Sequence, residues 1–290
     1  MTIRLLENVS PVLEEIASKE YLGRVPIIGR TESGSHDVLA YFPTGRSPGS
    51  RARFLAEQKD GSIKIDPSND AQPGQGNPAL IYYEAITLLS DGSLVVTNGA
   101  QTNLVAATAI QAENTKENLS PFELLQRAFS IPYMMKNFKV DAAGKKTNEM
   151  IDLTSFEPDA PNYTPRTSAV LGLERAAMSI VLKKGCGYEK RFFDIPLING
   201  VARALPTYTG QNVPSGEVIP SYDGVPFSIP VIGETAKDYA EVLWNSLGPK
   251  QGADVVSPGQ DFRVGVVAIF RDRKTHTLDY HVINKNQPKM

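Results

Sequence analysis

The sequence has few of the residues that build covalent cross-links or metal sites. Its 290 residues include one cysteine, Cys186, and three histidines, His36, His276 and His281. One cysteine cannot form an intramolecular disulfide, and it excludes a cysteine-rich zinc site. The histidine spacing matches no metal-binding motif, because His276 and His281 suit neither one helix face nor one strand face. We therefore expect no metal and no other cofactor.

Long apolar runs and an excess of either charge are absent too. No window approaches about 18 continuous apolar residues, so no segment is expected to span a membrane. Lys and Arg total 30 and Asp and Glu total 32, which gives a formal net charge of -2. This balance argues against general nucleic-acid binding. The first residues lack the apolar core of a signal peptide, so we expect a soluble, cytoplasmic protein.

The apolar pattern predicts many strands, a few helices and mostly antiparallel connections, which is the α+β class. Helical periodicity predicts helices over Pro121–Ala128 and Thr235–Leu247. Turn residues between apolar runs predict hairpins within 80–97, 191–205 and 262–284. No G-x-G-x-x-G or P-loop spacing occurs, which excludes a Rossmann or P-loop fold. No break in composition divides the chain, so we expect one domain.

Proline shapes the prediction for two further segments. Tyr21–Arg30 (YLGRVPIIGR) has the character of a strand, and Pro26 predicts that this strand is bulged or lies at a sheet edge. Residues 139–166 are mostly polar and contain proline, which predicts a long loop.

Arginines gather near the start of the chain. Arg24 and Arg30 each follow a glycine, and the loop PTGRSPGSRAR (43–53) also contains Ser47 and Ser50. Its own arginines are Arg46, Arg51 and Arg53. Guanidinium groups bind phosphate oxygens in pairs, and serine hydroxyls and glycine amides complete such a site. The alternative is a set of solvated arginines paired with nearby acids, which is the commoner situation.

A second polar segment, VVTNGAQTN over 95–103, leaves a predicted strand and enters a predicted helix. Amides at a helix N-terminus bind anions, and Asn98 or Gln101 could recognise a carboxamide or a purine edge. The alternative is a plain turn in which Thr102 or Asn103 is the helix N-cap.

Two pairs of residues could take part in proton transfer. Tyr82 and Tyr83 lie in an apolar strand, where a tyrosine is more often part of the core. Glu157 and Asp159 precede the triplet TPR at 164–166, and acids in a polar loop are more often only solvated. Either pair needs independent support before it is assigned a role.

Two residues could act as nucleophiles in an amide hydrolase. Cys186 lies in KKGCGYEK, where lysines could lower the pKa of a thiol, but no partner histidine is recognisable. Thr2 would become an N-terminal nucleophile if Met1 were removed. Both hypotheses stay open alongside the arginine cluster.

Several motifs in order resemble the archaeal-type IMP cyclohydrolase family. They are YLGRVPIIGR (21–30), AYFPTGRSPGSR (40–51), NPALIYY (77–83), VVTNGAQTN (95–103), NYTPR (162–166) and TYTGQN (207–212). The resemblance implies a four-layer α/β/β/α sandwich like that of N-terminal-nucleophile hydrolases, without a processed nucleophile. It also implies closure of 5-formamidoimidazole-4-carboxamide ribonucleotide to IMP in purine biosynthesis, by a homo-oligomeric enzyme.

The resemblance also implies roles for individual residues. Its catalytic arginine falls on Arg51 and its active-site tyrosine on Tyr82, while Glu157 and Asp159 compete for the place of its acid. The substrate-binding residues that it implies are Arg24, Arg30, Arg46, Ser47, Asn98 and Gly99. Met1–Glu20 is then an N-terminal extension to a single domain over 21–290. A non-catalytic protein that binds purine nucleotides, and the amide hydrolase above, are the competing readings.

Overall fold

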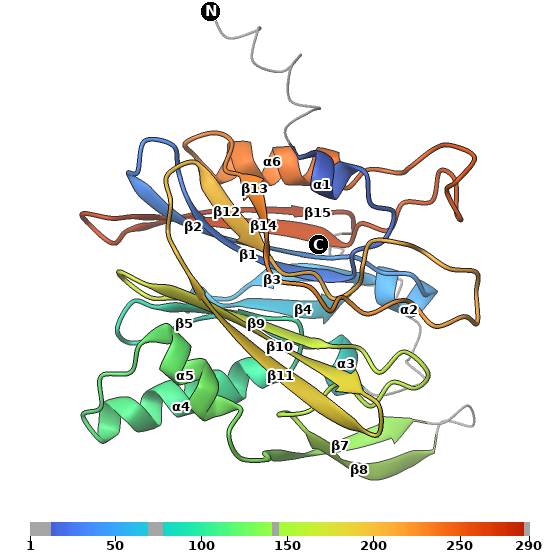
Figure 1. Ribbon diagram of the computed structural model, residues 1–290, viewed down its shortest axis with the longest axis horizontal. Helices are drawn as coiled ribbons and strands as arrows, with labels where there is room; N and C mark the ends of the chain where they lie inside the picture. The colour runs from blue at the N-terminus through green and yellow to red at the C-terminus, as the bar shows by residue number, and fades with distance from the viewer. Residues whose placement is uncertain (1–12, 69–77, 141–144, 287–290) are drawn as a thin grey trace, which may run out of the picture.

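Two antiparallel β-sheets lie face to face at the centre of the molecule (Figure 1). The computed structural model describes residues 13–68, 78–140 and 145–286. The six-stranded sheet contains, in spatial order, β13 (Phe227–Pro230), β12 (Val201–Ala204), β1 (Arg24–Arg30), β2 (His36–Pro43), β14 (Gly265–Asp272) and β15 (Leu278–Asn284). The seven-stranded sheet contains β11 (Gly187–Ile195), β10 (Ala176–Lys184), β9 (Arg166–Leu171), β6 (Leu94–Thr97), β5 (Tyr83–Leu88), β4 (Ile63–Pro67) and β3 (Arg53–Glu57).

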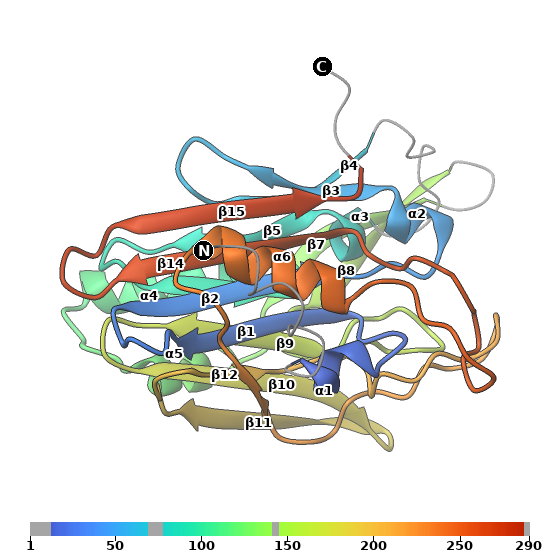
Figure 2. The ribbon, with the colours of Figure 1, turned by 90° about the horizontal axis from the view of Figure 1, so that it is seen from above.

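Helices cover the outer faces of both sheets. On the six-stranded sheet lie α1 (Glu14–Ala17) and α6 (Ala236–Ser246), and Figure 2 looks onto this face. On the seven-stranded sheet lie α4 (Gln101–Asn114) and α5 (Pro121–Ala128). The structure therefore confirms the predicted class of antiparallel strands with few helices. Among the described residues, none of the helices is long and apolar enough to cross a membrane.

The central strands β1, β2 and β14 of the six-stranded sheet are buried on both faces. On β2, Leu39 and Tyr41 face the seven-stranded sheet, while Ala40 and Phe42 face α6. Because successive side chains of a strand point to opposite faces, a strand covered on both sides is apolar throughout. This explains why the sequence of β2 (HDVLAYFP) has no polar alternation.

The two predicted helices are confirmed, and their ends follow local rules. Ser120 and Glu123 form a reciprocal capping box at the start of α5, with Pro121 as the first helical residue. Thr235 caps α6 by accepting a hydrogen bond from the Asp238 amide. Both ends were readable from sequence because each depends on residues only three positions apart.

Pro26 does not place β1 at an edge, contrary to the prediction. β1 lies between β12 and β2, and Pro26 pairs with Tyr41 of β2 without a bulge. The pairing with β12 begins only at Ile27, and the Pro26 carbonyl accepts a bond from the Leu205 amide beyond the end of β12. The nitrogen of a strand residue points to the same side as its carbonyl. Pro26 has no N–H group, and its nitrogen faces β12 just beyond the last residue pair of the β1–β12 ladder.

Two other predictions about strands are wrong. Residues 139–166 are not one long loop, because β7 (Met134–Val140) and β8 (Lys146–Asp152) form a separate two-stranded sheet that reaches into this range. Residues 191–205 are not a hairpin, because β11 pairs with β10 in one sheet and β12 pairs with β1 in the other. The hairpins β5–β6 and β14–β15 are confirmed. Strand pairing across long sequence separations has no local signal, which explains the second of these errors.

Candidate functional site

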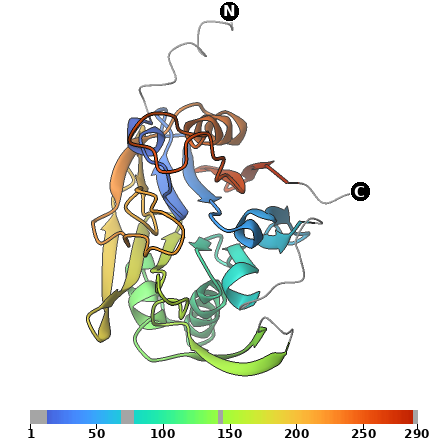
Figure 3. The ribbon, with the colours of Figure 1, turned by 90° about the vertical axis from the view of Figure 1, so that its right-hand side faces the viewer.

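A cavity of about 270 Å³ opens at the end of the molecule where β1 begins and β2 ends. The short helices α2 (Pro48–Arg51) and α3 (Pro78–Ile81) lie at this end, which faces the viewer in Figure 3. The cavity is lined by Tyr21, Arg24, Thr44, Ser50, Arg53, Leu80, Ile81, Glu157 and Asp159. Its volume is close to the lower limit of about 300 Å³ that is usual for small-molecule sites.

Glu157 is buried between two arginines. Its Oε2 lies 2.7 Å from Arg24 Nη2, and its Oε1 lies 3.7 Å from Arg166 Nη1. Burial would lower the pKa of the Arg24 guanidinium, but the Glu157 carboxylate more than compensates and raises this pKa. Burial lowers the pKa of Arg166, and Glu157 only partly offsets this effect. The two arginines and one carboxylate thus form a compact, charged group with an excess of positive charge.

Hydrogen bonds with Thr207 and a closely packed glycine fix the backbone at Arg24. The Thr207 hydroxyl donates to the Arg24 carbonyl at 2.8 Å and accepts from the Arg24 amide at 3.2 Å. Gly23 has a φ of 78°, and a Cβ there would lie 2.7 Å from Cδ2 of Tyr208. Only glycine fits this combination of backbone angle and space. The glycine of the GR motif therefore aims Arg24 into the cavity.

Asn98 braces the site instead of pointing into the cavity. Its Nδ2 donates to the Pro165 carbonyl at 2.7 Å, and its Oδ1 accepts from the Thr167 amide at 2.9 Å. Gln101 Nε2 donates to the same oxygen at 2.8 Å. Because these groups are buried and bonded within the protein, the side chain of Asn98 has little left to offer a ligand. Its carbonyl accepts a hydrogen bond from Arg24.

The polar segment 95–103 also positions Glu157. A Cβ on Gly99 would lie 2.9 Å from Oε1 of Glu157, so the missing side chain makes room for the acid. Neither Thr102 nor Asn103 caps α4, contrary to the prediction. The N-cap is Ala100, without a side-chain bond, and the Thr102 hydroxyl pairs with that of Thr97 at 2.6 Å.

Asp159 lines the same cavity, and its surroundings raise its pKa toward neutral pH. Burial and the nearby Glu157 carboxylate raise the pKa of Asp159 from 3.8 to about 6. The Thr164 amide donates to Asp159 Oδ1 at 2.7 Å, and the Thr164 hydroxyl bonds to Oδ2. That hydroxyl also pairs with the Tyr208 hydroxyl at 2.8 Å. A buried chain of exchangeable hydrogens thus leads from Asp159 to Tyr208.

The arginine loop supplies the opposite wall of the cavity. Arg53 is buried and donates to the carbonyls of Ser50 at 2.7 Å and Ile81 at 3.1 Å. Burial raises the pKa of Tyr21, and the charges of Arg24, Arg53 and Arg46 partly offset this effect. Nη1 of Arg46 is buried without a hydrogen-bond partner. The loop therefore has unused capacity to bind an anion.

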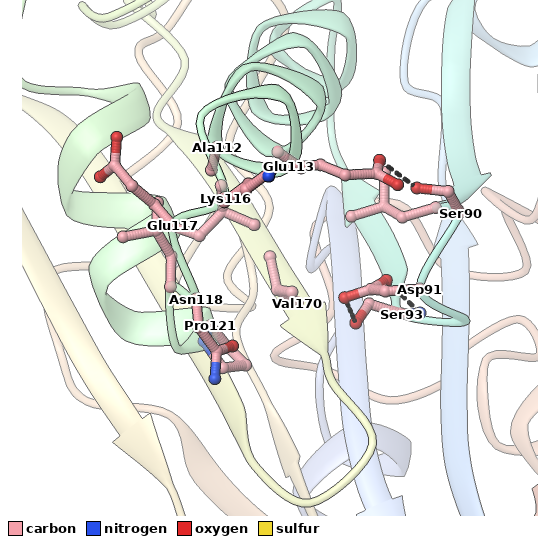
Figure 4. Close-up of a pocket in the computed structure, with 14 residues that line it drawn as sticks. Ser90, Asp91, Ser93, Ala112, Glu113, Lys116, Glu117, Asn118, Pro121 and Val170 are labelled. Carbon is pink, nitrogen blue, oxygen red and sulfur yellow. Dashed lines mark hydrogen bonds between the residues drawn. The ribbon is translucent and has the colours of Figure 1, made fainter.

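A second cavity of about 330 Å³ lies on the other side of the seven-stranded sheet, between α4, α5 and the β5–β6 turn (Figure 4). Its carboxylates are engaged: Glu113 accepts from Ser90 at 2.6 Å, and Asp91 accepts from Ser93 at 3.0 Å. None of the residues expected from sequence to form a site lines it. Within the described ranges, no group of three or more His, Cys, Asp or Glu side chains could hold a metal. The first cavity is therefore the candidate site.

A family model matches part of the chain. It is described as IMP cyclohydrolase-like protein, and it matches residues 21–128, well under half of the chain. This segment is IMP cyclohydrolase-like. No curated protein matches the chain. The IMP cyclohydrolase-like segment contributes Tyr21, Arg24 and Arg53 to the cavity, whereas Glu157 and Asp159 lie beyond it.

The structure does not bring all the sequence candidates to the cavity. Arg30 lies at the other end of β1, about 20 Å from Arg24 at ~3.4 Å per residue, and its Nε lies 2.8 Å from Asp37 Oδ1. Asp37 is also paired with the buried Arg271. Arg30 therefore belongs to a separate ionic cluster that joins β1, β2 and β14.

Three further candidates of the arginine loop, Arg46, Ser47 and Arg51, are not part of the cavity lining. Arg51 Nη1 donates to the Arg46 carbonyl at 2.6 Å, and Arg53 lines the wall instead. Ser47 is exposed and caps α2 by accepting from the Ser50 amide at 3.1 Å. Cys186 is exposed in the β10–β11 turn, and Thr2 lies outside the described residues.

Among the neighbouring tyrosines, Tyr83 rather than Tyr82 contacts the charged group. The Tyr83 hydroxyl pairs with that of Tyr41 at 2.7 Å, and the Arg24 guanidinium lies 5.9 Å from the Tyr83 ring. Tyr82 is half-buried between α3 and β5. The sequence candidates also omitted Arg166, although the triplet TPR was noticed, and Thr44, for which no local signal exists.

Proposed function

We propose that this cavity closes 5-formamidoimidazole-4-carboxamide ribonucleotide to IMP with loss of water. The observation that carries the proposal is the pair of acids, Glu157 and Asp159, facing the same cavity as the cations Arg24 and Arg53. Arginine side chains bind phosphate oxygens, and an acid that titrates near neutral pH can transfer a proton. The IMP cyclohydrolase-like segment supports the same reaction.

The reaction needs positioning and proton transfer more than bond polarisation. The carboxamide nitrogen attacks the formyl carbon, a new carbon–nitrogen bond forms, and the formyl oxygen becomes a hydroxyl. That hydroxyl leaves as water, and the two hydrogens of the water come from the carboxamide and formamido nitrogens. Both reacting groups belong to one molecule, so holding the reactive rotamer supplies much of the rate.

Each residue of the cavity has a place in this scheme. Arg24 stabilises the negative charge that develops on the formyl oxygen, because its position is fixed before the substrate arrives. Asp159 protonates the departing hydroxyl. It regains a proton through the hydroxyls of Thr164 and Tyr208. Glu157 keeps Arg24 charged and oriented.

The arginine loop binds the phosphate in this proposal. Arg53 and Ser50 line the cavity, and Arg46 has the unpartnered buried nitrogen. Catalytic roles for Arg51 and Tyr82 are proposed only because the family resemblance implies them. If Arg51 binds only phosphate, Arg51→Ala raises KM, and if Tyr82 is the acid, Tyr82→Phe lowers kcat.

The proposal is tested by following IMP absorbance with the chemically formylated substrate. We expect turnover above the uncatalysed rate, a large fall in kcat for Arg24→Lys, and wild-type rates for Arg127→Lys, a control on the surface of α5. Arg53→Lys should mainly raise KM. IMP binding by calorimetry without turnover would instead support a non-catalytic nucleotide-binding protein. Absence of both would contradict the proposal.

The proposal extends to the wider expectations of the resemblance. We propose that the two sheets and their covering helices correspond to the sandwich of N-terminal-nucleophile hydrolases without a processed nucleophile. A homo-oligomer acting in the cytoplasm on a purine nucleotide belongs to the same proposal.

A further inference from the structure

The loop over 153–165 carries both acids of the candidate site, and its outer side contacts a lysine of β10. The Phe156 and Tyr163 rings meet edge to face, with centroids 5.4 Å apart and an interplanar angle of 85°. Lys183 Nζ lies 3.3 Å from the Tyr163 ring centroid and 6.0 Å from that of Phe156. Both distances are within the ~6 Å range of cation–π attraction.

The two rings flank the acids in the sequence. Phe156 precedes Glu157, whose side chain contacts Arg24 on the cavity side. Tyr163 precedes Thr164, whose amide and hydroxyl bind Asp159. The Glu157 amide also donates to the Thr164 carbonyl at 2.9 Å, which closes the segment between the rings. A displacement of the ring pair would therefore move both carboxylates together.

One aromatic residue of this loop has an unusual backbone conformation. Tyr163 has a φ of 47°, in the left-handed region that a bulky residue rarely adopts. No regular secondary structure spans 153–165. Attraction between the Lys183 ammonium and the Tyr163 ring favours the observed conformation over more common backbone angles.

We propose that Lys183 is a positioning residue for the candidate site: seated on the Tyr163 ring, its ammonium holds the loop that aims Glu157 and Asp159 into the cavity. The role in turnover rests on the proposed function, whereas the hold on the loop does not. Lys183 itself is exposed on β10, close to the β10–β11 turn. Removal of its charge, by substitution or by acylation of the amine, would loosen the acids without touching the cavity.

Three variants separate charge from packing. Lys183→Met keeps the apolar stem and removes the charge, and Lys183→Arg keeps a cation over the ring. Lys184→Met is the matched control, because alternation along the strand turns Lys184 to the other face, where its Nζ lies 3.9 Å from Glu189. Urea unfolding of each variant gives the global stability against which local effects are compared.

Amide hydrogen exchange at Glu157 and Thr164 tests the hold on the loop without any assumption about activity. We expect exchange about 2- to 5-fold faster in Lys183→Met, which corresponds to about 0.5–1 kcal/mol of cation–π attraction. Lys183→Arg and Lys184→Met should exchange as the wild type does. Wild-type exchange in Lys183→Met would overturn the proposal.

Kinetics test the role in the reaction. We expect Lys183→Met to lower kcat by a similar factor with KM unchanged, and Lys183→Arg to restore it. Faster exchange with an unaltered kcat would show that the loop position does not matter for turnover, and would overturn the positioning role. If the wild-type protein does not turn over the substrate, the proposed function fails, and the exchange result still decides whether Lys183 holds the loop.

Discussion

Asp159→Asn should make the protein more stable at neutral pH, although it removes a residue of the candidate site. Burial and the charge of Glu157 raise the pKa of Asp159 from 3.8 to about 6 in the folded protein. The folded state therefore keeps the proton to a higher pH than the unfolded chain does. Between these two values the folded state binds more protons, so the free energy of unfolding falls as pH rises. Above about pH 6 the ionised carboxylate of Asp159 destabilises the fold.

The size of this effect follows from the shift. A difference of about 2 pH units corresponds to about 3 kcal/mol at ~1.36 kcal/mol per unit, and it is fully developed at pH 7. Asparagine keeps the oxygen that accepts from the Thr164 amide, and its amide group can donate to the Thr164 hydroxyl. That hydroxyl can then donate its own hydrogen to Tyr208. The substitution thus removes the charge while preserving the local hydrogen bonds.

Urea unfolding of both proteins between about pH 3 and about pH 8, a range that extends beyond both pKa values, measures the difference directly. The gain from Asp159→Asn should approach about 3 kcal/mol at pH 7 and vanish as the pH falls to about 3, where Asp159 is neutral in both the folded and the unfolded state. Because the substitution removes one titratable group, the difference reports Asp159 together with its coupling to Glu157. A difference independent of pH, or a less stable variant at pH 7, would refute the assignment of a raised pKa.

Two further substitutions probe the charged group and the tyrosines. Glu157→Gln should destabilise the fold by about 3–5 kcal/mol in urea unfolding, because Arg24 and Arg166 lose their buried counter-charge; a loss below about 1 kcal/mol would mean that water reaches the pair. Tyr83→Phe should cost about 1–3 kcal/mol by leaving a buried partner hydroxyl unbonded, with kcat reduced through Arg24. Tyr82→Phe serves as its control for stability, and equal losses from both would contradict the distinction between the two tyrosines.

The helices and local hairpins were accessible from sequence because their signals are short-range. The capping box of Ser120 and Glu123 and the apolar face of α6 need only neighbouring residues. The partner of β12 could not be read in this way, because β1 lies far away in the chain. The hairpin β7–β8 was missed for another reason: its outer face is exposed, so polar residues interrupt the apolar pattern.

The candidate site likewise contains some residues that could be found from sequence and others that could not. Arg24, Glu157 and Asp159 were candidates because their motifs contain glycine, proline or acids in unusual combinations. Arg30 has the same GR motif as Arg24, but the length of β1 carries it to the opposite end of the sheet. Sequence identifies which residue types are available. The direction and length of each strand decide which of them meet.

The like charges of the cavity lower the stability of the fold, and a bound anion would relieve part of this cost. The three cations at the cavity, Arg24, Arg53 and the Arg166 behind Glu157, outnumber its two acids, Glu157 and Asp159. The charge of Arg24 helps to lower the pKa of Arg166, and the charge of Glu157 helps to raise that of Asp159, so both kinds of group suffer like-charge repulsion. A phosphate ligand would add negative charge next to the cations, and the fraction of Asp159 that is protonated near pH 6 would still be able to donate. Binding should therefore stabilise the fold as ligand concentration rises above Kd. The arrangement is unfavourable for stability alone and favourable for a doubly charged substrate that must also receive a proton.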